Sequence, residues 1–192
     1  DTEETSCTSD FKVIVPASTM LEVSRIFADD DEAEFKLYAG KNRVEFKTEN
    51  ILISSRVLEG DFIDYVKVMN VEPDTIVEVD TGKLQSAVER ANILAREGNK
   101  NNLVIFNIAD NFIEVKADTE LGSISDKVAC NIQGEELTIA FNARFFIDAL
   151  RTIDAAMIQL NFSGSTGPCI ITPISVDNHK NFILPVKLGD NS

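Results

Sequence analysis

The chain has 192 residues, which is enough for one large domain or two small ones. Hydrophobic residues make up 44% of it and charged residues 26%, the composition of a soluble globular protein, and no apolar run approaches the ~20 residues that a membrane-spanning helix needs. The formal net charge of −14 has the opposite sign to that of most nucleic-acid-binding proteins.

The start of the chain and its cysteines bear on where the protein works. Residues 1–10 are polar, so we expect a disordered or connecting segment. They lack the basic start and apolar centre of a signal peptide, and because Asp1 stands where an initiator Met would, we expect a piece of a longer protein. Cys7, Cys130 and Cys169 lie far apart and form no CxxC motif, which indicates reduced thiols in a cytoplasmic protein.

An apolar strand followed by a short amphipathic helix is predicted three times. The strands begin at residues 11, 75 and 137, which gives a period of about 63 residues. The strand and helix of each copy are 11–16 with 17–28, 75–80 with 81–97, and 137–142 with 143–153. A unit with one small helix cannot bury its sheet face alone, so this period predicts an architecture built by repetition.

Alternating apolar and polar residues predict further strands after each helix. They are 35–38, 43–47 and 51–58 in the first copy, 103–108, 112–117 and 125–132 in the second, and 157–162, 169–174 and 181–188 in the third. Each copy is then a βαβββ unit, and the predicted fold class is α+β, with helices on one face of antiparallel sheets. Residues 61–74 are expected to be a linker. Copies two and three then make one complete domain, 71–192, after a half-domain with its connector, 1–70.

Each predicted helix has an apolar face that is expected to point into a core. These faces consist of Met20, Ser24 and Phe27 in the first helix, of Leu84, Ala87, Val88, Ala91 and Leu94 in the second, and of Phe146, Ala149, Leu150 and Ile153 in the third. The remaining positions of the helices are mostly polar, which is the pattern of helices that lie on a sheet.

The predicted helices are more basic than the rest of the chain. Ranges 17–28, 82–97 and 142–153 hold six cations and four acids, a net charge of +2, so the other residues carry −16. This distribution fits a cation-bearing face on an acidic body. It also fits Lys and Arg that serve only as good helix formers on a solvated surface, and composition leaves both readings open.

Motifs for catalysis or metal binding are missing from the sequence. His179 is the only histidine and has no Cys or His at metal-ligand spacing, so no metal site is expected. No GxSxG, HExxH or P-loop motif occurs, and no helix follows the loop 164–168 to help bind a phosphate. Acid pairs such as Asp61 and Asp64 are expected by chance among 32 acidic residues. We therefore expect neither an enzyme nor a cofactor.

Three segments point to a known family. They are SRVLEGDFIDY at 55–65, ERANILA at 89–95 and FILPVKL at 182–188. Together they resemble the bacterial sliding clamp, the β subunit of DNA polymerase III, and the resemblance extends over residues 12–188. The first segment is the most specific, because it matches the family motif L-x-G-x-F-P-D-Y with Ile63 in place of the proline. The last matches M-P-M-R-L with Lys187 in place of the arginine.

The resemblance implies a ring. Six βαβββ units form three domains in this family, and two chains close head to tail into a homodimer around duplex DNA. This chain matches the last three units, which are the second half of the middle domain and the whole last domain. The implied function is that of a non-catalytic processivity factor in the cytoplasm that encircles DNA of any sequence. The alternative is a repeat-built peptide-binding scaffold with no role on DNA.

The resemblance also implies a groove for linear peptides of polymerase, clamp loader and repair proteins. The matching positions are Ile63, Val68, Asn142, Phe145, Pro168, Phe182, Leu184, Pro185, Val186 and Lys187. The family's second groove wall, a D-G-H-R-L-A-like segment, does not occur here, so the groove is expected to be incomplete. For Leu184 and Val186 the alternative is that their side chains alternate into the sheet core.

Two further surfaces follow from the resemblance. Helix cations are expected to face the DNA backbone without touching bases, and they are Arg25, Lys83, Arg90, Arg144 and Arg151. Ile93 and Leu94, at the end of the second helix, are expected to form the subunit interface with a first domain that this chain does not match.

Overall fold

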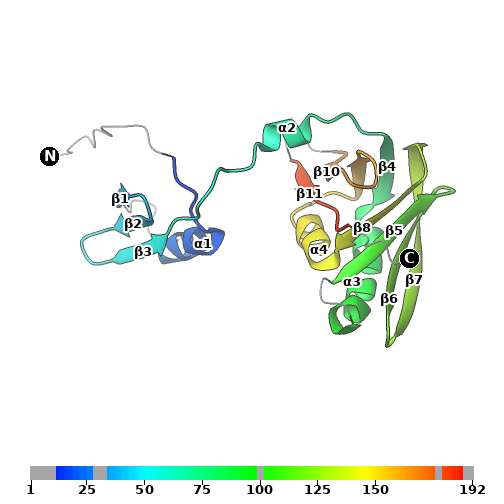
Figure 1. Cartoon of the computed structure of the whole chain (residues 1–192), viewed down its shortest axis with the longest axis horizontal. Coiled ribbons are helices and arrows are strands. Elements are labelled where there is room, and N and C mark those ends of the chain that lie inside the picture. Colours follow the sequence, from blue (N-terminus) through cyan, green and yellow to red (C-terminus); the bar gives the residue numbers. More distant parts are fainter. Residues whose placement is uncertain (1–11, 28–33, 99–101, 176–178, 188–192) are drawn as a thin grey trace. The chain divides into compact units, whose positions relative to one another are not determined.

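The computed structural model describes residues 12–27, 34–98, 102–175 and 179–187. The chain divides into two compact units, Asp1–Asp64 and Tyr65–Ser192, which we call unit 1 and unit 2. Unit 1 contains the first predicted copy and unit 2 contains the other two (Figure 1). Among the described residues, no helix is long and apolar enough to cross a membrane.

Unit 1 packs one helix against a three-stranded antiparallel sheet. Its elements are α1 (Ala17–Ile26), β1 (Lys36–Ala39), β2 (Arg43–Lys47) and β3 (Leu52–Arg56), with the strand order β1-β2-β3. The strand predicted at 11–16 is wrong for its described part, which forms only an isolated bridge between Ile14 and Leu58. The small core of this unit contains Val23, Val44 and Phe46.

The outer side of β1 is open within the described part of unit 1. β1 pairs with β2 alone, and its residues Leu37 and Tyr38 are exposed. Leu21 of α1 is exposed as well. The helix and three strands of this copy therefore leave a strand edge and several apolar side chains uncovered within the described residues.

The buried face of α1 is shifted by one residue from the predicted face. Met20 and Ser24 are exposed, whereas Val23 is buried. The hydroxyl groups of Thr19 and Ser55 lie 2.7 Å apart, which directs the Thr19–Val23 side of the helix toward the sheet. Phe27 alone of the predicted face packs as expected, with its ring stacked on Phe35 at a centroid distance of 5.5 Å.

Unit 2 contains the second and third copies. Its elements are α2 (Tyr65–Met69), β4 (Thr75–Asp80), α3 (Thr81–Gly98), β5 (Leu103–Ala109), β6 (Phe112–Thr119), β7 (Gly122–Gly134), β8 (Leu137–Asn142), α4 (Ala143–Arg151), β9 (Met157–Phe162), β10 (Cys169–Pro173) and β11 (Asn181–Ile183). The predicted order βαβββ is confirmed for both copies. The linker prediction missed α2, which follows Asp64, a residue type favoured at helix starts, and contains neither Gly nor Pro.

The two copies exchange strands. The eight-stranded antiparallel sheet has the order β11-β10-β9-β4-β7-β6-β5-β8. β4 of the second copy pairs with β9 of the third, and β8 of the third copy pairs with β5 of the second. β4 also pairs with β7 of its own copy over five residues. The corresponding contact in the third copy is a single hydrogen bond, in which the Val186 N–H donates to the Ala140 carbonyl at 2.8 Å.

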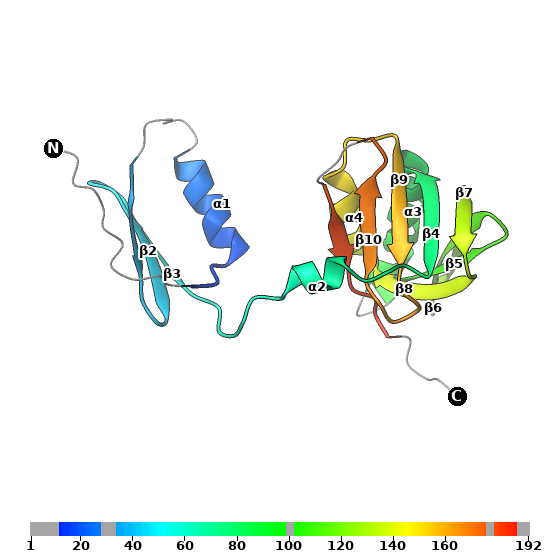
Figure 2. The same ribbon diagram turned by 90° about the horizontal axis from the view of Figure 1, so that it is seen from above.

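The sheet therefore almost closes on itself around the two helices. α3 and α4 contact each other, and the Arg151 guanidinium donates to the Glu89 carboxylate across them at 3.1 Å. In Figure 2 both helices lie behind the strands β10, β9 and β4. The predicted side-by-side packing of these helices on one face of the sheet is confirmed.

Four phenylalanines form the centre of the core of unit 2. Phe106, Phe141, Phe146 and Phe162 are all fully buried. The ring of Phe141 lies 5.5 Å from that of Phe106, 5.3 Å from that of Phe146 and 6.5 Å from that of Phe162, measured between centroids. Because these side chains come from β5, β8, α4 and β9, the cluster joins both copies.

The last strand is shorter than predicted. β11 ends at Ile183, which pairs with Cys169, whereas the predicted strand extended to 188, beyond the described residues. The next pair along this register would join Leu184 to Pro168, and Pro185 follows Leu184. Neither proline has an N–H to donate, so the ladder ends here. Residues 184–187 continue as an irregular segment.

A row of polar side chains crosses β8, β5, β6 and β7. The Thr138 hydroxyl donates to Asn107 at 3.0 Å, and the Asn107 amide donates to the Glu114 carboxylate at 3.4 Å. Lys116 and Ser125 also bond to Glu114, at 2.8 and 2.7 Å. Hydrogen bonds from Lys116 and then from Ser125 are the main causes that lower the pKa of Glu114 to about 2.

The core cluster predicts the effect of removing one ring. Phe141→Ala should lower the free energy of unfolding by about 3–5 kcal/mol, because it leaves a cavity among three other buried rings. Urea denaturation followed by circular dichroism measures this. Phe112→Ala, at a largely exposed position, should cost less than about 1 kcal/mol. Equal losses in the two variants would contradict the assignment of the core.

The polar row predicts a pH dependence. The folded-state pKa of Glu114 lies below its ordinary value of 4.5, so the folded chain binds fewer protons than the unfolded chain between about pH 4.5 and 2. The stabilisation by Glu114 is therefore complete above pH ~4.5 and is lost as the pH falls toward 2. NMR titration of the Glu114 carboxyl carbon should show this low midpoint, and Lys116→Met should raise it. A midpoint near 4.5 in the parent chain would contradict the network.

Candidate functional site

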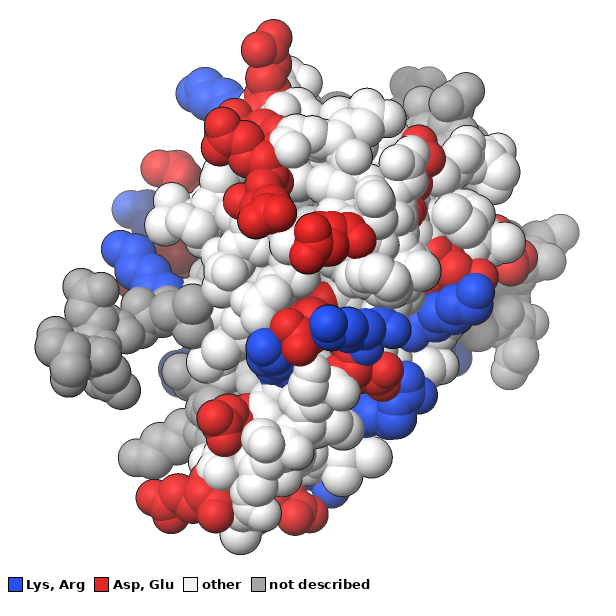
Figure 3. Space-filling model, turned by 90° about the vertical axis from the view of Figure 1, so that its right-hand side faces the viewer, with Lys and Arg blue, Asp and Glu red and all other residues white. Residues whose placement is uncertain are grey.

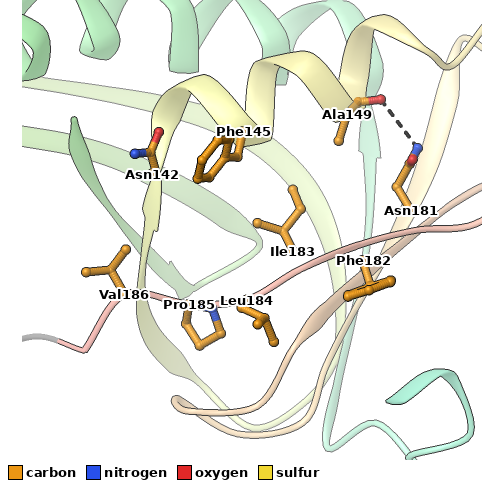
Figure 4. Close-up of a pocket in the computed structure, with 9 residues that line it drawn as sticks. All are labelled: Asn142, Phe145, Ala149, Asn181, Phe182, Ile183, Leu184, Pro185 and Val186. Atoms are coloured by element: carbon orange, nitrogen blue, oxygen red, sulfur yellow. Dashed lines mark hydrogen bonds between the residues drawn. The ribbon is translucent and has the colours of Figure 1, made fainter. Parts of the chain in front are cut away.

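A cavity of about 640 Å³ opens between α4 and the chain segment that includes β11. It is lined by Asn142, Phe145, Ala149, Asn181, Phe182, Ile183, Leu184, Pro185 and Val186. Figure 4 shows the helix above the cavity and the segment 181–186 passing below it. The cavity lies beside the single hydrogen bond that joins Val186 to Ala140, where the sheet is almost closed.

The helix wall of the cavity follows from the spacing of three residues. Asn142, Phe145 and Ala149 lie at i, i+3 and i+7, which places them on one side of a helix. Asn142 is also the N-cap of α4, because its side-chain oxygen accepts a hydrogen bond from the Arg144 N–H at 3.0 Å. Phe145 is 62% exposed, whereas its neighbour Phe146 points into the core.

The opposite wall is the segment that leaves the sheet after β11. Ile183 is buried and pairs with Cys169, and Leu184 is 58% exposed. Val186 is partly buried and keeps its backbone bond to Ala140. Leu184 thus does not alternate into the sheet core, which was the alternative reading for this residue.

Polar side chains line this cavity only at its two ends. Asn142 lies at one end and Asn181 at the other, and the seven lining residues between them are apolar (Figure 4). The Asn181 amide donates to the Ala149 carbonyl at 3.4 Å and to the Thr152 hydroxyl at 3.1 Å. Such a surface fits apolar side chains attached to a backbone that needs few specific hydrogen bonds.

The structure brings six of the ten predicted groove residues together around the cavity. They are Asn142, Phe145, Phe182, Leu184, Pro185 and Val186. Pro168 is partly buried just before β10, Val68 is partly buried in α2, and Lys187 is exposed directly after Val186. Ile63 is exposed and belongs to unit 1. None of these four lines the cavity, and their role in a groove stays a prediction.

The sequence prediction missed three lining residues. Ile183 belongs to β11 and Asn181 opens it, and the expected core position Ala149 also borders the cavity. Helical spacing from Asn142 and Phe145 would have indicated Ala149. No pattern in the sequence indicates Asn181, because its position depends on where β11 begins.

Four of the five cations expected to face DNA form ion pairs. Arg25 bonds to Glu22 at 2.8 Å, Arg90 bonds to Asp126, Arg144 lies 3.9 Å from Asp148 and Arg151 bonds to Glu89 at 3.1 Å. Lys83 is exposed, and no ion pair of its side chain is found in the part of the chain that the structure describes. All five side chains lie at the surface, and their contact with DNA stays a prediction.

Acidic and basic side chains are mixed on the surface that Figure 3 shows. Asp and Glu gather in its upper part, while Lys and Arg lie in a band lower down, next to further acids. Acidic side chains interrupt the basic band, so this face has no continuous basic patch.

The predicted interface residues differ in accessibility. Ile93 is among the most exposed apolar residues, whereas Leu94 is partly buried and packs against the core of unit 2. Only Ile93 therefore offers most of its side chain to a second chain. The assignment of both residues to a subunit interface stays a prediction.

The described residues contain no arrangement suited to metal binding. Across 12–27, 34–98, 102–175 and 179–187, no group of three or more His, Cys, Asp or Glu side chains could hold a metal ion. Burial raises the pKa of Cys130 to about 11 and that of Cys169 still further, so both thiols stay protonated at neutral pH. The best-formed site is thus an apolar cavity suited to binding.

Comparison with known proteins gives a consistent result over nearly the whole chain. The model of the DNA polymerase III beta subunit, C-terminal domain, matches residues 66–187, and that of the central domain of the same subunit matches residues 2–64. The beta sliding clamp of Staphylococcus aureus is 31% identical over 177 residues, and that of Staphylococcus epidermidis is 30% identical. These matches cover 91% of this chain and 46% of either relative, so the chain spans about half their length.

Solved structures agree with the sequence comparisons. The DNA polymerase III beta chain of Streptococcus pneumoniae superposes with a TM-score of 0.75 at 27% identity, over 94% of this chain and 48% of that one. The DNA polymerase sliding clamp of Bacillus subtilis gives a TM-score of 0.71 at 30% identity, with the same coverage of 94% and 48%.

Proposed function

Because this chain belongs to the family of the DNA polymerase III beta subunit, we propose that it serves as part of a sliding clamp, a non-catalytic processivity factor. Its task is to stay on duplex DNA of any sequence and to hold polymerase, clamp loader and repair proteins near it. The chain spans 46% of its curated relatives, so the ring is a property proposed for the longer protein. The proposed site of action is the cytoplasm.

The cavity between α4 and the segment 181–186 carries this proposal. It is apolar along its length, it has an amide at each end, and Phe145 and Leu184 stand exposed on its two walls. The occupant is a linear peptide with apolar anchor side chains, because such a peptide fills an open apolar groove without a large rigid interface. In unit 2, Val68, Pro168 and Lys187 extend the proposed groove beyond the cavity, and a role of Ile63 of unit 1 stays a prediction.

The proposed mode of DNA binding is topological. A clamp has to slide, so its lining is expected to meet phosphates weakly and to leave the bases alone. A net charge of −14 and helix cations paired with acids support weak attraction rather than a tight grip. Ile93, exposed in the C-terminal half of α3, is the proposed centre of the contact that closes the homodimeric ring.

The alternative is a peptide-binding scaffold with no role on DNA, which would use the same cavity. The two differ in what the helices do. Both matching family models describe the polymerase beta subunit, which favours the clamp.

The charge distribution predicts weak DNA binding by the chain itself. A labelled 30-base-pair duplex titrated at about 150 mM salt should give a dissociation constant weaker than about 10 μM by fluorescence anisotropy, because the net charge opposes association. Lys83→Glu should reduce any residual binding at low salt. A sub-micromolar dissociation constant for the isolated chain would contradict retention of DNA by topology.

The cavity predicts which side chains matter for peptide binding. A suitable probe is a fluorescein-labelled octapeptide with two leucines and one phenylalanine among serines and glycines. Leu184→Ala should weaken its binding by more than ~1 kcal/mol, about fivefold, because an exposed apolar contact of the groove is lost.

The matched control is Leu121→Ala. Leu121 is 66% exposed but lies outside the cavity, so its truncation should leave the affinity for the octapeptide unchanged. If Leu184→Ala and Phe145→Ala both bind the octapeptide as the parent does, the cavity is not the binding site.

A further inference from the structure

A cluster of polar side chains joins the end of α4 to the start of β11. The Asn181 Nδ2 atom lies 3.1 Å from the Thr152 Oγ1 atom and 3.0 Å from the His179 Nε2 atom. It also donates to the Ala149 carbonyl at 3.4 Å, and the Thr152 hydroxyl donates to the same carbonyl at 2.8 Å. The last carbonyls of a helix have no partners within it, so this cluster satisfies one of them.

The hydrogens in the cluster can be assigned from its distances. Thr152 has one hydroxyl hydrogen, which its short bond to the Ala149 carbonyl uses. The Thr152 oxygen therefore accepts from the Asn181 amide. The longer contact of the amide with the Ala149 carbonyl shares this N–H, and the second N–H points to the His179 Nε2 atom. Nε2 also lies 3.3 Å from the Thr152 oxygen, whose hydrogen is already used, so Nε2 must carry a lone pair. The network thus selects the imidazole form with its hydrogen on Nδ1.

The reverse orientation of the Asn181 amide satisfies fewer groups. Its oxygen would then face the Ala149 carbonyl, which is an acceptor as well. The Thr152 hydroxyl would have to leave that carbonyl in order to donate to the amide oxygen. The two orientations differ in the nitrogen of His179 that holds the hydrogen, which can be measured.

The cluster is one of two hydrogen-bonded links across the cavity. At the other end of the segment 181–186, the Val186 N–H donates to the Ala140 carbonyl of β8 at 2.8 Å. Between these ends the segment keeps its strand partner only as far as Ile183. The distance between α4 and the exposed wall around Leu184 therefore depends on the polar cluster at one end and on a backbone bond at the other, while residues 181–183 pair with β10. Figure 4 shows the Asn181–Ala149 bond of the cluster.

We propose that Thr152 and His179 are positioning residues of the groove: through Asn181 they set the separation of its two walls and so its affinity for apolar peptide side chains. Neither residue lines the cavity, so they act without touching the peptide. The inference rests on the proposed peptide-binding function and names a determinant of that function that lies outside the cavity itself.

The first test measures binding of the same octapeptide to the full 192-residue chain. Thr152→Val keeps the shape of the side chain but removes its hydrogen-bonding oxygen, so binding should weaken about three- to tenfold. His179→Phe keeps a ring but removes the acceptor, and it should have a similar effect. Thr152→Ser loses the methyl group but keeps the hydroxyl, and it should bind within twofold of the parent. A loss of affinity seen in Thr152→Val but not in Thr152→Ser is then due to the hydroxyl and not to packing.

The matched control is Thr138→Val. Its hydroxyl also donates to an asparagine, Asn107 at 3.0 Å, but neither residue lines the cavity. It should bind the peptide within twofold of the parent. If Thr152→Val binds as tightly as Thr138→Val does, the positioning role is overturned.

The second test needs no substitution. His179 is the only histidine, so a long-range proton–nitrogen NMR spectrum at pH 8 reads its tautomer without assignment work. The network requires Nε2 without a hydrogen, and a hydrogen found on Nε2 would overturn it. This measurement stands even if one of the variants fails to fold.

The outcomes separate the inference from the function on which it rests. Binding that is lost in Leu184→Ala but unchanged in Thr152→Val and His179→Phe overturns the positioning role alone. Binding unchanged in Leu184→Ala, or no binding by the parent chain, overturns the proposed groove and the inference with it. Weaker binding in Leu184→Ala, Thr152→Val and His179→Phe, with rescue by Thr152→Ser, supports both.

Discussion

Unit 2 depends on the exchange of one strand between its two copies. β4 and β8 each begin one copy, but each pairs with the first of the three later strands of the other copy. Neither copy can complete its half of the sheet alone, because each lacks a strand that only the other supplies. The exchange also brings α3 and α4 together, and it places Phe106, Phe141, Phe146 and Phe162 in one cluster. A repeat with a period of about 63 residues thus becomes one cooperative domain.

The cavity arises where the repeat is imperfect. Within the second copy, β4 and β7 pair over five residues, whereas in the third copy β8 and the segment after β11 share one hydrogen bond. Pro168 and Pro185 lie where the ladder would continue, and neither has an N–H to donate. The segment after β11 is consequently released from its neighbour, and Leu184 stays exposed beside α4. The cavity therefore forms without a dedicated loop, at the place where the second copy has an ordinary sheet.

The sequence predicted most of the architecture because hydrophobic periodicity reports burial directly. β2 and β9 begin and end at the predicted residues, and Leu84, Ala87, Val88 and Ala91 of α3 are buried as expected. The predictions that were wrong concern features that single local contacts determine. A hydroxyl pair between Thr19 and Ser55 turns α1, and two prolines end β11 early. Six groove residues follow from family resemblance, whereas Asn181 enters the cavity through a side-chain network that periodicity does not encode.

β1 is an unpaired edge of the sheet in the described part of unit 1. Within the described residues β1 bonds on one side only, and its residues Leu37 and Tyr38 are exposed, as is Leu21 of α1. Unpaired strand edges with apolar side chains are templates for the addition of further strands, and charge or a covering element normally blocks this. Within the described residues, unit 2 thus leaves almost no free strand edge, whereas in unit 1 β1 is the edge to which a further strand would add.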